Sequence, residues 1–238
     1  MQNISTNYIG QNITTRINKN IFSIINIFKM NTRTTFFILV CSTCVIHFLS
    51  KMLLFSDDLY FNSFAEQLTY EQIENIINEG KKWKWLSYTF IPILTFVKLT
   101  LVASCLSVSL FFIANKFSFK AAFRVALEVE FVFLVPPLLK ILWFALFQTD
   151  YTLQELQVFY PLSTLNFFDY TTLQPWLIYP LQLFNVFEII YWVLLARGVS
   201  QIIERDMGKS LEVVATSYGT GLLLWVAVVM FITVSFTP

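Results

Sequence analysis

Five apolar stretches constrain what this chain can fold into more than any other feature. They lie near residues 34–55, 86–114, 122–147, 174–197 and 214–236. An α-helix rises about 1.5 Å per residue, so each stretch can cross a hydrocarbon core of roughly 30 Å. The chain is 13% charged, about half of the roughly 25% that is usual in soluble domains. We therefore expect an all-α membrane protein, a bundle of five transmembrane helices.

The charges in the connecting loops predict the orientation of these helices. Basic residues without acidic ones precede the first stretch, and basic residues also join the second stretch to the third: Arg16, Lys19, Lys29 and Arg33, then Lys116, Lys120 and Arg124. The segments 56–84 and 148–174 are acidic, although Lys51, Lys81, Lys82 and Lys84 run against this pattern at the first of them. Because positive loops stay in the cytoplasm, the N-terminus is predicted to be cytoplasmic and the C-terminus external. The net charge of +1 gives no reason to expect a nucleic-acid partner.

The chain is predicted to consist of two parts. Residues 1–33 form a cytoplasmic N-terminal tail without the features of a signal peptide, and residues 34–238 form the five-helix transmembrane domain. The tail is expected to be mobile or to lie on the membrane surface. Its apolar segment 21–28 fits a short helix in the inner leaflet, anchored by Lys19 and Lys29. Met30 is an alternative start of the protein.

Both external loops carry signals for short amphipathic helices. Thr69 and Gln72 have capping-box spacing ahead of an apolar pattern, and Gly80 is placed to end a helix over 69–79. A second box, from Thr152 to Glu155, predicts another short helix. Such helices either dock a partner or satisfy their own backbone groups beside the lipid, and we favour the second interpretation.

A short pattern occurs twice in the second half of the chain. Tyr160-Pro161-Leu162, followed by Asn166, Phe168 and Asp169, is echoed by Tyr179-Pro180-Leu181, followed by Asn185, Phe187 and Glu188. The second copy lies inside the fourth apolar stretch. The first copy is too short to span, so it either dips into the outer leaflet or matches by chance.

Ionisable residues inside the apolar stretches are the strongest candidates for a functional site. They are Lys98, Glu130, Lys140 and Glu188, and Glu128 is placed nearer the headgroups. Charges at membrane depth are costly unless they are paired or hydrated, so these side chains should face the bundle interior. We expect Lys98 to pair with Glu188, with Glu130 or Lys140 as the next candidates. The pairing either fixes the bundle, which we favour, or forms a proton or ion relay.

Two adjacent prolines, Pro136 and Pro137, lie at the centre of the third stretch. They remove two backbone donors and predict a kink or break. Broken helices line substrate sites in transporters, and simple kinks are also common. Small residues four apart predict close helix contacts: Ala103 with Ser107, Ala215 with Gly219, and Ser217 with Gly221.

The remaining motifs give no support for catalysis. Cys41, Cys44 and His47 share one helical arc, with Cys105 at comparable depth, so they are weak candidates for a metal or redox site. Cysteine in hydrocarbon is more often a small apolar residue. Phosphate-binding loops, zinc-protease and serine-hydrolase motifs are absent from the sequence. We expect neither an enzyme nor a cofactor.

Three sequence segments carry a family resemblance. They are Phe117-Ser-Phe-Lys-Ala-Ala122, Phe187-Glu-Ile-Ile-Tyr-Trp-Val-Leu-Leu-Ala-Arg-Gly198 and Lys209-Ser-Leu-Glu212. Together with five spans, they resemble the Yip-domain family of membrane proteins, particularly its bacterial members. The resemblance covers about 36–236 and implies a role in membrane organisation or assembly. The long acidic N-terminal region of the Rab-binding members is missing, so Rab binding is not implied.

The expected function follows from this resemblance and from the composition. We expect a non-enzymatic protein of the bacterial cytoplasmic (inner) membrane, whose partners are the lipid bilayer and other membrane proteins. The alternative is a transporter, or a transporter membrane subunit, that uses the intramembrane charges.

Overall fold

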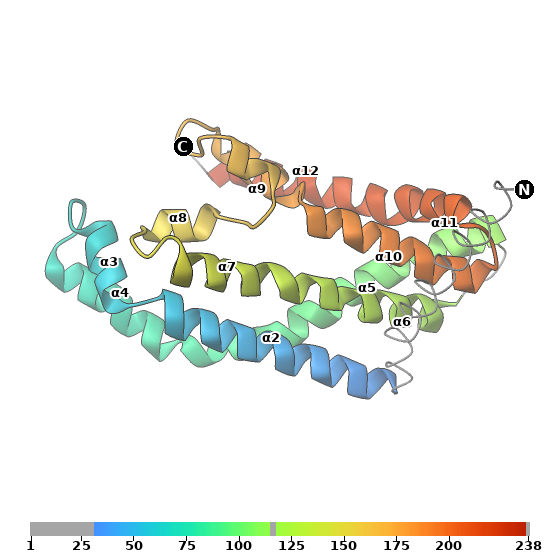
Figure 1. Ribbon diagram of the computed structural model, residues 1–238, viewed down its shortest axis with the longest axis horizontal. Coiled ribbons are helices and arrows are strands. Elements are labelled where there is room, and N and C mark those ends of the chain that lie inside the picture. Colours follow the sequence, from blue (N-terminus) through green and yellow to red (C-terminus); the bar gives the residue numbers. More distant parts are fainter. Residues whose placement is uncertain (1–30, 115–117, 237–238) are drawn as a thin grey trace, which may run out of the picture. The chain divides into compact units, whose positions relative to one another are not determined.

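The computed structural model describes residues 31–114 and 118–236, and the regular structure of these residues is helical (Figure 1). The predictions for the tail and for Met30 lie outside them. The chain divides into two compact units, Met1–Ile38 and Leu39–Pro238. The tertiary contacts below all lie within the second unit.

The described residues include five helices that are long and apolar enough to cross a membrane. The first is α2 (Thr32–Leu54) and the second is α5 (Lys84–Ala114). The third consists of α6 (Phe119–Val129), a 3-10 turn η1 (Glu130–Leu134) and α7 (Val135–Leu146). The fourth is α10 (Val186–Ile203), and the fifth consists of α11 (Met207–Val214), a π-helical turn η3 (Ala215–Gly219) and α12 (Thr220–Phe236). The predicted number of spans is confirmed.

The fourth span differs from its prediction, because the stretch 174–197 is not one helix. It is divided into α9 (Pro175–Leu183) and α10, and α10 continues to Ile203. Asn185 lies at the division: its side chain accepts a hydrogen bond from the Glu188 backbone N–H at 2.9 Å and caps α10.

The two copies of the repeated pattern meet at this division. Ser163 and Asn185 form an antiparallel bridge, and the Thr164 backbone N–H donates to the Phe184 carbonyl at 2.9 Å. The copies nevertheless differ in conformation, because the first contains the 3-10 turn η2 (Thr164–Phe167) and the second contains α9. The first copy therefore supplies hydrogen bonds to backbone groups left free where the fourth span is interrupted.

Three short helices occupy the loops before α5 and after α7. They are α3 (Asp57–Phe64), α4 (Tyr70–Lys82) and α8 (Leu153–Val158). Both predicted capping boxes are present, at Thr69 with Gln72 and at Thr152 with Glu155. Gly80 does not end α4, as its position had suggested, because the helix continues to Lys82 and is capped by Trp83.

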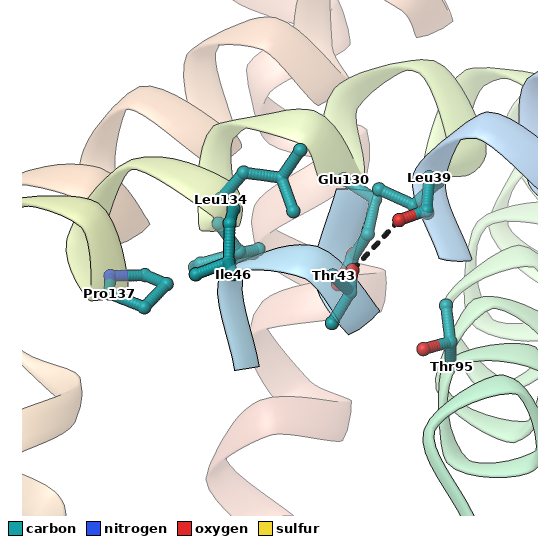
Figure 2. A pocket seen from close by; sticks show the side chains of 8 residues that line it. Leu39, Thr43, Ile46, Thr95, Glu130, Leu134 and Pro137 are labelled. Carbon is teal, nitrogen blue, oxygen red and sulfur yellow. Dashed lines mark hydrogen bonds between the residues drawn. The ribbon is translucent and has the colours of Figure 1, made fainter. Parts of the chain in front are cut away.

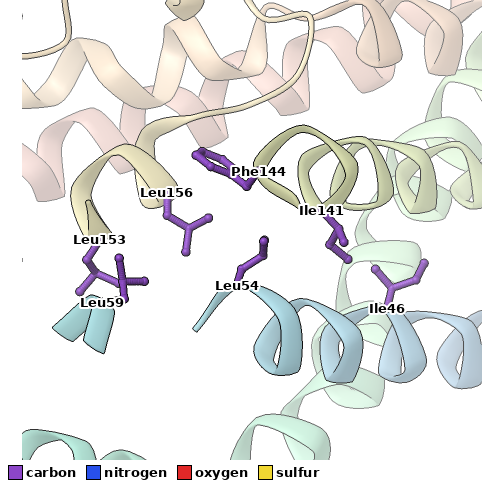
Figure 3. Close-up of a cluster of buried hydrophobic side chains, with 7 residues drawn as sticks. All are labelled: Ile46, Leu54, Leu59, Ile141, Phe144, Leu153 and Leu156. Atoms are coloured by element: carbon purple, nitrogen blue, oxygen red, sulfur yellow. The ribbon is translucent and has the colours of Figure 1, made fainter. Parts of the chain in front are cut away.

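A cluster of buried apolar side chains joins these loops to the ends of the first and third spans (Figure 3). It is formed by Ile46, Leu54, Leu59, Ile141, Phe144, Leu153 and Leu156. Two hydrogen bonds reinforce it: the Tyr151 hydroxyl donates to the Leu54 carbonyl at 3.0 Å, and the Leu153 N–H donates to Ser63 Oγ at 2.9 Å. The helices α3 and α8 are therefore packed onto the bundle.

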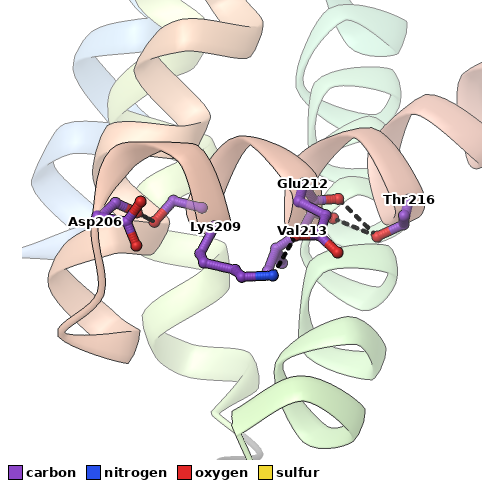
Figure 4. A network of polar contacts seen from close by, with 6 residues as sticks. Asp206, Lys209, Glu212, Val213 and Thr216 are labelled. Atoms are coloured by element: carbon purple, nitrogen blue, oxygen red, sulfur yellow. Dashed lines mark hydrogen bonds and ion pairs between the residues drawn. The ribbon is translucent and has the colours of Figure 1, made fainter.

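The first turns of the fifth span, in α11, carry polar contacts (Figure 4). Lys209 Nζ lies 2.8 Å from Glu212 Oε2 on the exposed side of α11, and the Thr216 hydroxyl donates to the Glu212 carbonyl at 2.8 Å. The Ser210 hydroxyl donates to the Asp206 carbonyl at the start of α11. These local bonds fix the turn from which the fifth span begins.

Candidate functional site

The third span is interrupted where the prolines predict, and Glu130 begins the interruption. Pro136 and Pro137 lie in the first turn of α7, where a missing backbone N–H costs little. The turn η1 precedes them, and the Val135 N–H donates to the Val132 carbonyl. The tighter 3-10 bond thus satisfies a carbonyl to which Pro136 could not donate.

Glu130 forms an ion pair with Lys98 of the second span. Lys98 Nζ lies 2.6 Å from Glu130 Oε1, and it lies 3.9 Å from the centre of the Phe133 ring. The Glu130 side chain is 9% exposed and that of Lys98 is 44% exposed. The expected Lys98–Glu188 pair is therefore wrong, and the next candidate, Glu130, takes its place.

Tyr191 of the fourth span is completely buried beside this pair. Its ring lies 4.8 Å from Phe133 and 5.4 Å from Tyr218, measured between centroids. Lys98 Nζ lies 5.8 Å from the centre of the Tyr191 ring. Within the described residues, neither the Tyr191 hydroxyl nor Glu130 Oε2 has a partner in hydrogen-bond geometry. In the Lys98–Glu130 ion pair, Glu130 Oε2 is therefore a buried acceptor without a hydrogen bond.

Glu188 is held by neutral donors. The Tyr218 hydroxyl donates to Glu188 Oε1 at 2.7 Å, and Trp192 Nε1–H donates to the same oxygen at 2.9 Å. Glu188 is 8% exposed, and the salt bridges of the described residues do not include it. Two donors from the fourth and fifth spans thus stabilise a buried acidic group in place of a cation.

These side chains form one continuous group across four spans, which we call the central cluster. Its members are Lys98, Glu130, Phe133, Glu188, Tyr191, Trp192 and Tyr218. The sequence reasoning missed its aromatic members. A signal was available, because Tyr191 and Trp192 follow Glu188 by three and four residues and so share its helix face.

A small pocket adjoins the central cluster at Glu130. Its volume is about 110 Å³, and Figure 2 shows that its lining comes from the first, second and third spans. The lining residues are Leu39, Thr43, Ile46, Thr95, Glu130, Phe133, Leu134 and Pro137. Thr43 donates its hydroxyl proton to the Leu39 carbonyl at 2.9 Å. Glu130 is the pocket's ionisable side chain.

The other predicted charges lie outside the central cluster. Lys140 is half-buried, and no salt bridge of the described residues includes it. Glu128 is paired with Arg124 on its own helix, with Nε and Oε1 separated by 2.8 Å. This ion pair of Glu128 thus lies within α6 and joins it to no other span.

The cysteines and His47 do not form a metal site. Among the residues that the structure describes, no group of histidine, cysteine, aspartate or glutamate side chains could hold a metal ion. Cys41 is exposed and Cys44 is partly exposed. His47 packs edge-on against Tyr88, with ring centroids 5.5 Å apart. Cys105 instead faces Gly221 of the fifth span, where an added Cβ would lie 3.1 Å from its sulfur.

The predicted small-residue contacts are confirmed in part. A Cβ added at Gly219 would lie 2.7 Å from Trp192 Cη2, so the glycine allows the central cluster to close. Ala103 and Ser107 are buried in the second span, whereas Ala215 is exposed and makes no such contact.

Comparisons of the chain with protein-family models, with curated proteins and with solved structures find no match. The resemblance to the Yip-domain family stays a prediction.

Proposed function

We propose that this chain is a non-enzymatic, multi-pass protein of Yip type that organises the membrane or assembles with other membrane proteins. We place it in the bacterial cytoplasmic membrane, with its N-terminus in the cytoplasm and its C-terminus outside. The loop charges and the sequence resemblance support this placement.

One observation carries the proposal: the buried ionisable groups are used to join spans to one another. The Lys98–Glu130 pair links the second and third spans at 2.6 Å. The bond from Tyr218 to Glu188 links the fifth and fourth spans at 2.7 Å. Buried charges that are bonded between spans stabilise one arrangement of the bundle. This favours a structural role for them over a role in a proton or ion transport pathway.

The outer surface of the bundle supports a role in contacting lipid or partners. The helix α12 is apolar on all sides and has no buried residue. Large side chains along it are exposed, among them Leu223, Leu224 and Phe231. In a membrane such a helix lies against lipid or against another membrane protein.

A second candidate function is transport, and the pocket at Glu130 favours it. An interrupted span, an ionisable side chain and a cavity coincide there. The same combination occurs at the substrate and ion sites of transporters. The cavity volume of about 110 Å³ suits only a small ion or a few water molecules.

The test combines partner identification with flux measurements. The protein is purified in mild detergent, and associated proteins are identified by mass spectrometry. Wild type and the double variant Lys98→Leu with Glu130→Leu are compared. An organising role predicts that both retain the same partners and that neither carries ions in liposomes.

Two outcomes would contradict the proposed function. One is proton-driven flux in liposomes that Glu130→Gln abolishes, and the other is a stoichiometric ATPase partner. Either result would establish the transport alternative.

A further inference from the structure

A large groove lies at the end of the third span, away from the central cluster. Its volume is about 830 Å³, within the range of roughly 300–1,000 Å³ typical of small-molecule sites. One wall is formed by the last turns of α7, with Leu139, Leu142 and Leu146. The other is formed by α8 and the segment after it, including Val158 and Leu165.

The groove has both apolar and polar lining. Leucines of the membrane-spanning α7 line one part, and four polar side chains come from the chain beyond α7, which we call the mouth of the groove: Gln148, Glu155, Asn166 and Tyr170. Trp143 marks the boundary, because its Nε1–H donates to Gln148 Oε1 at 3.2 Å. Tryptophan with a wet polar edge is typical of the membrane interface. The groove thus offers apolar side chains that suit the hydrocarbon chains of a lipid and polar side chains that suit its headgroup.

The mouth of the groove is negatively charged. Glu155 is the one charged side chain in the lining, and the segment 148–174 contains Asp150 and Asp169 but neither lysine nor arginine. Bonds from Thr171 lower the pKa of Asp169, which keeps it ionised. Burial raises the pKa of Tyr170, and the nearby charges of Glu155 and Asp169 raise it further.

Hydrogen-bond acceptors remain available at this mouth. Glu155 Oε2 accepts from the Thr152 N–H at 2.7 Å and from its hydroxyl at 3.1 Å. Among the residues that the structure describes, the one donor to Glu155 Oε1 is Gln148 Nε2, at 3.5 Å, the outer limit of a hydrogen bond. A ligand with N–H donors and a positive charge would complete the bonding of this oxygen.

We propose that the groove binds a phospholipid with a primary ammonium headgroup, such as phosphatidylethanolamine. Its acyl chain lies against Leu142 and Leu146, and its ammonium group donates to Glu155 Oε1. A lipid with an anionic headgroup should bind less well, because its negative charge would lie beside the negative charge of Glu155 with no cation between them. This inference rests on the groove and is independent of the central cluster.

The variant Glu155→Gln isolates the charge, because glutamine keeps the fold of α8. The N3 position of a capping box accepts either glutamate or glutamine, and Gln72 already fills that position in α4. A matched control is Glu74→Gln, which removes an exposed acidic charge from α4 outside the groove.

The test is native mass spectrometry of the full chain in mild detergent. Phosphatidylethanolamine, phosphatidylcholine and phosphatidylglycerol with identical acyl chains are added in equal amounts. We expect wild type and Glu74→Gln to prefer phosphatidylethanolamine over phosphatidylglycerol by roughly tenfold, the effect of one charge-assisted hydrogen bond. Glu155→Gln should lose most of this preference, and Leu142→Trp, which fills the groove, should lose binding of all three lipids.

Three results would overturn the proposal. The first is equal binding of the three lipids to wild type. The second is a preference for phosphatidylethanolamine that survives both Glu155→Gln and Leu142→Trp. The third is stronger binding of phosphatidylglycerol that is lost in Lys140→Leu, which would assign lipid binding to the lysine of α7.

Discussion

Lys98 Nζ lies 2.6 Å from Glu130 Oε1, and this contact joins the second span to the interruption of the third. The two partners are buried unequally, because the Glu130 side chain is 9% exposed and the Lys98 side chain is 44% exposed. Loss of either partner leaves the other charge at membrane depth. The loss of stability should differ between the two cases. An unpaired Lys98 is long and half-exposed, so it can turn toward a polar region, whereas an unpaired Glu130 carboxylate stays buried.

We predict an asymmetric double-mutant cycle for this pair. Lys98→Leu should reduce the free energy of unfolding by about 3–5 kcal/mol, because it leaves Glu130 buried and unpaired. Glu130→Leu should reduce the free energy of unfolding by less, and the double variant should regain most of the stability that Lys98→Leu loses. Thermal unfolding in detergent measures these values. If the double variant were as unstable as Lys98→Leu, the pair would not be the reason for the loss.

The Tyr218 hydroxyl should contribute to stability through Glu188. Tyr218→Phe removes one of the two donors to Glu188 Oε1, so we expect a loss of about 1.5–3 kcal/mol, typical of a bond to a charged group. Tyr70→Phe is the control, because Tyr70 is 70% exposed. Thermal unfolding of both variants in one detergent gives the comparison. Equal stability of the two would show that the bond to Glu188 contributes nothing.

Replacement of Gly198 in α10 by alanine should lower the stability of the protein, whereas replacement of Gly80 in α4 by alanine should raise it. A Cβ at Gly198 would lie 2.3 Å from Val125 Cγ1 of α6, whereas a Cβ at Gly80 would meet nothing within 4 Å. We expect Gly198→Ala to destabilise the protein by about 1–3 kcal/mol through overpacking. Gly80→Ala should stabilise it by up to about 1 kcal/mol, because alanine favours a helix interior. A stable Gly198→Ala variant would disprove the close packing of α6 on α10.

Adjacent leucines of α2 provide a test of the apolar cluster that holds the loop helices. Leu54 is 1% exposed and belongs to the cluster, and Leu53 is 54% exposed. Leu54→Ala should cost about 2–5 kcal/mol by leaving a cavity. Leu53→Ala should change stability little, since Leu53 contacts lipid or detergent. Limited proteolysis within the segment 56–68 should also be faster in Leu54→Ala alone.

Single-cysteine labelling in intact cells tests the predicted orientation. Cysteines introduced at Lys120 and Lys209 should be protected from a membrane-impermeant reagent, and cysteines at Glu74 and Thr164 should react. For Lys120, Glu74 and Thr164 the expectation follows from the loop charges. The loop that contains Lys209 is mixed in charge, and its cytoplasmic placement follows from the alternation of sides along five spans. The background is a chain in which Cys41, Cys44 and Cys105 are replaced by alanine. Labelling at Lys120 or Lys209 would refute the cytoplasmic placement of these loops.

The amino-acid sequence alone determined the number of spans, most of their ends and the loop helices with capping boxes. These features depend on local properties: the length of an apolar run, the side chain at a helix cap, and a proline that cannot donate. The tertiary structure decided the rest. The fourth stretch is divided at Asn185, where two residues distant in the sequence bond to the interrupted backbone: the Thr164 N–H donates to the Phe184 carbonyl, and the Leu162 carbonyl accepts from the Val186 N–H.

The partner of each buried charge was likewise a tertiary property. Depth along a span indicated Lys98 and Glu188 as a pair, but the side chains that meet are set by how each helix is rotated and where it is interrupted. The third span contains the 3-10 turn Glu130–Leu134, which includes Phe133, and the fifth span contains the π-helical turn Ala215–Gly219, which includes Tyr218. Helical periodicity assumes a constant rotation per residue, so it could not place side chains beyond these irregular turns.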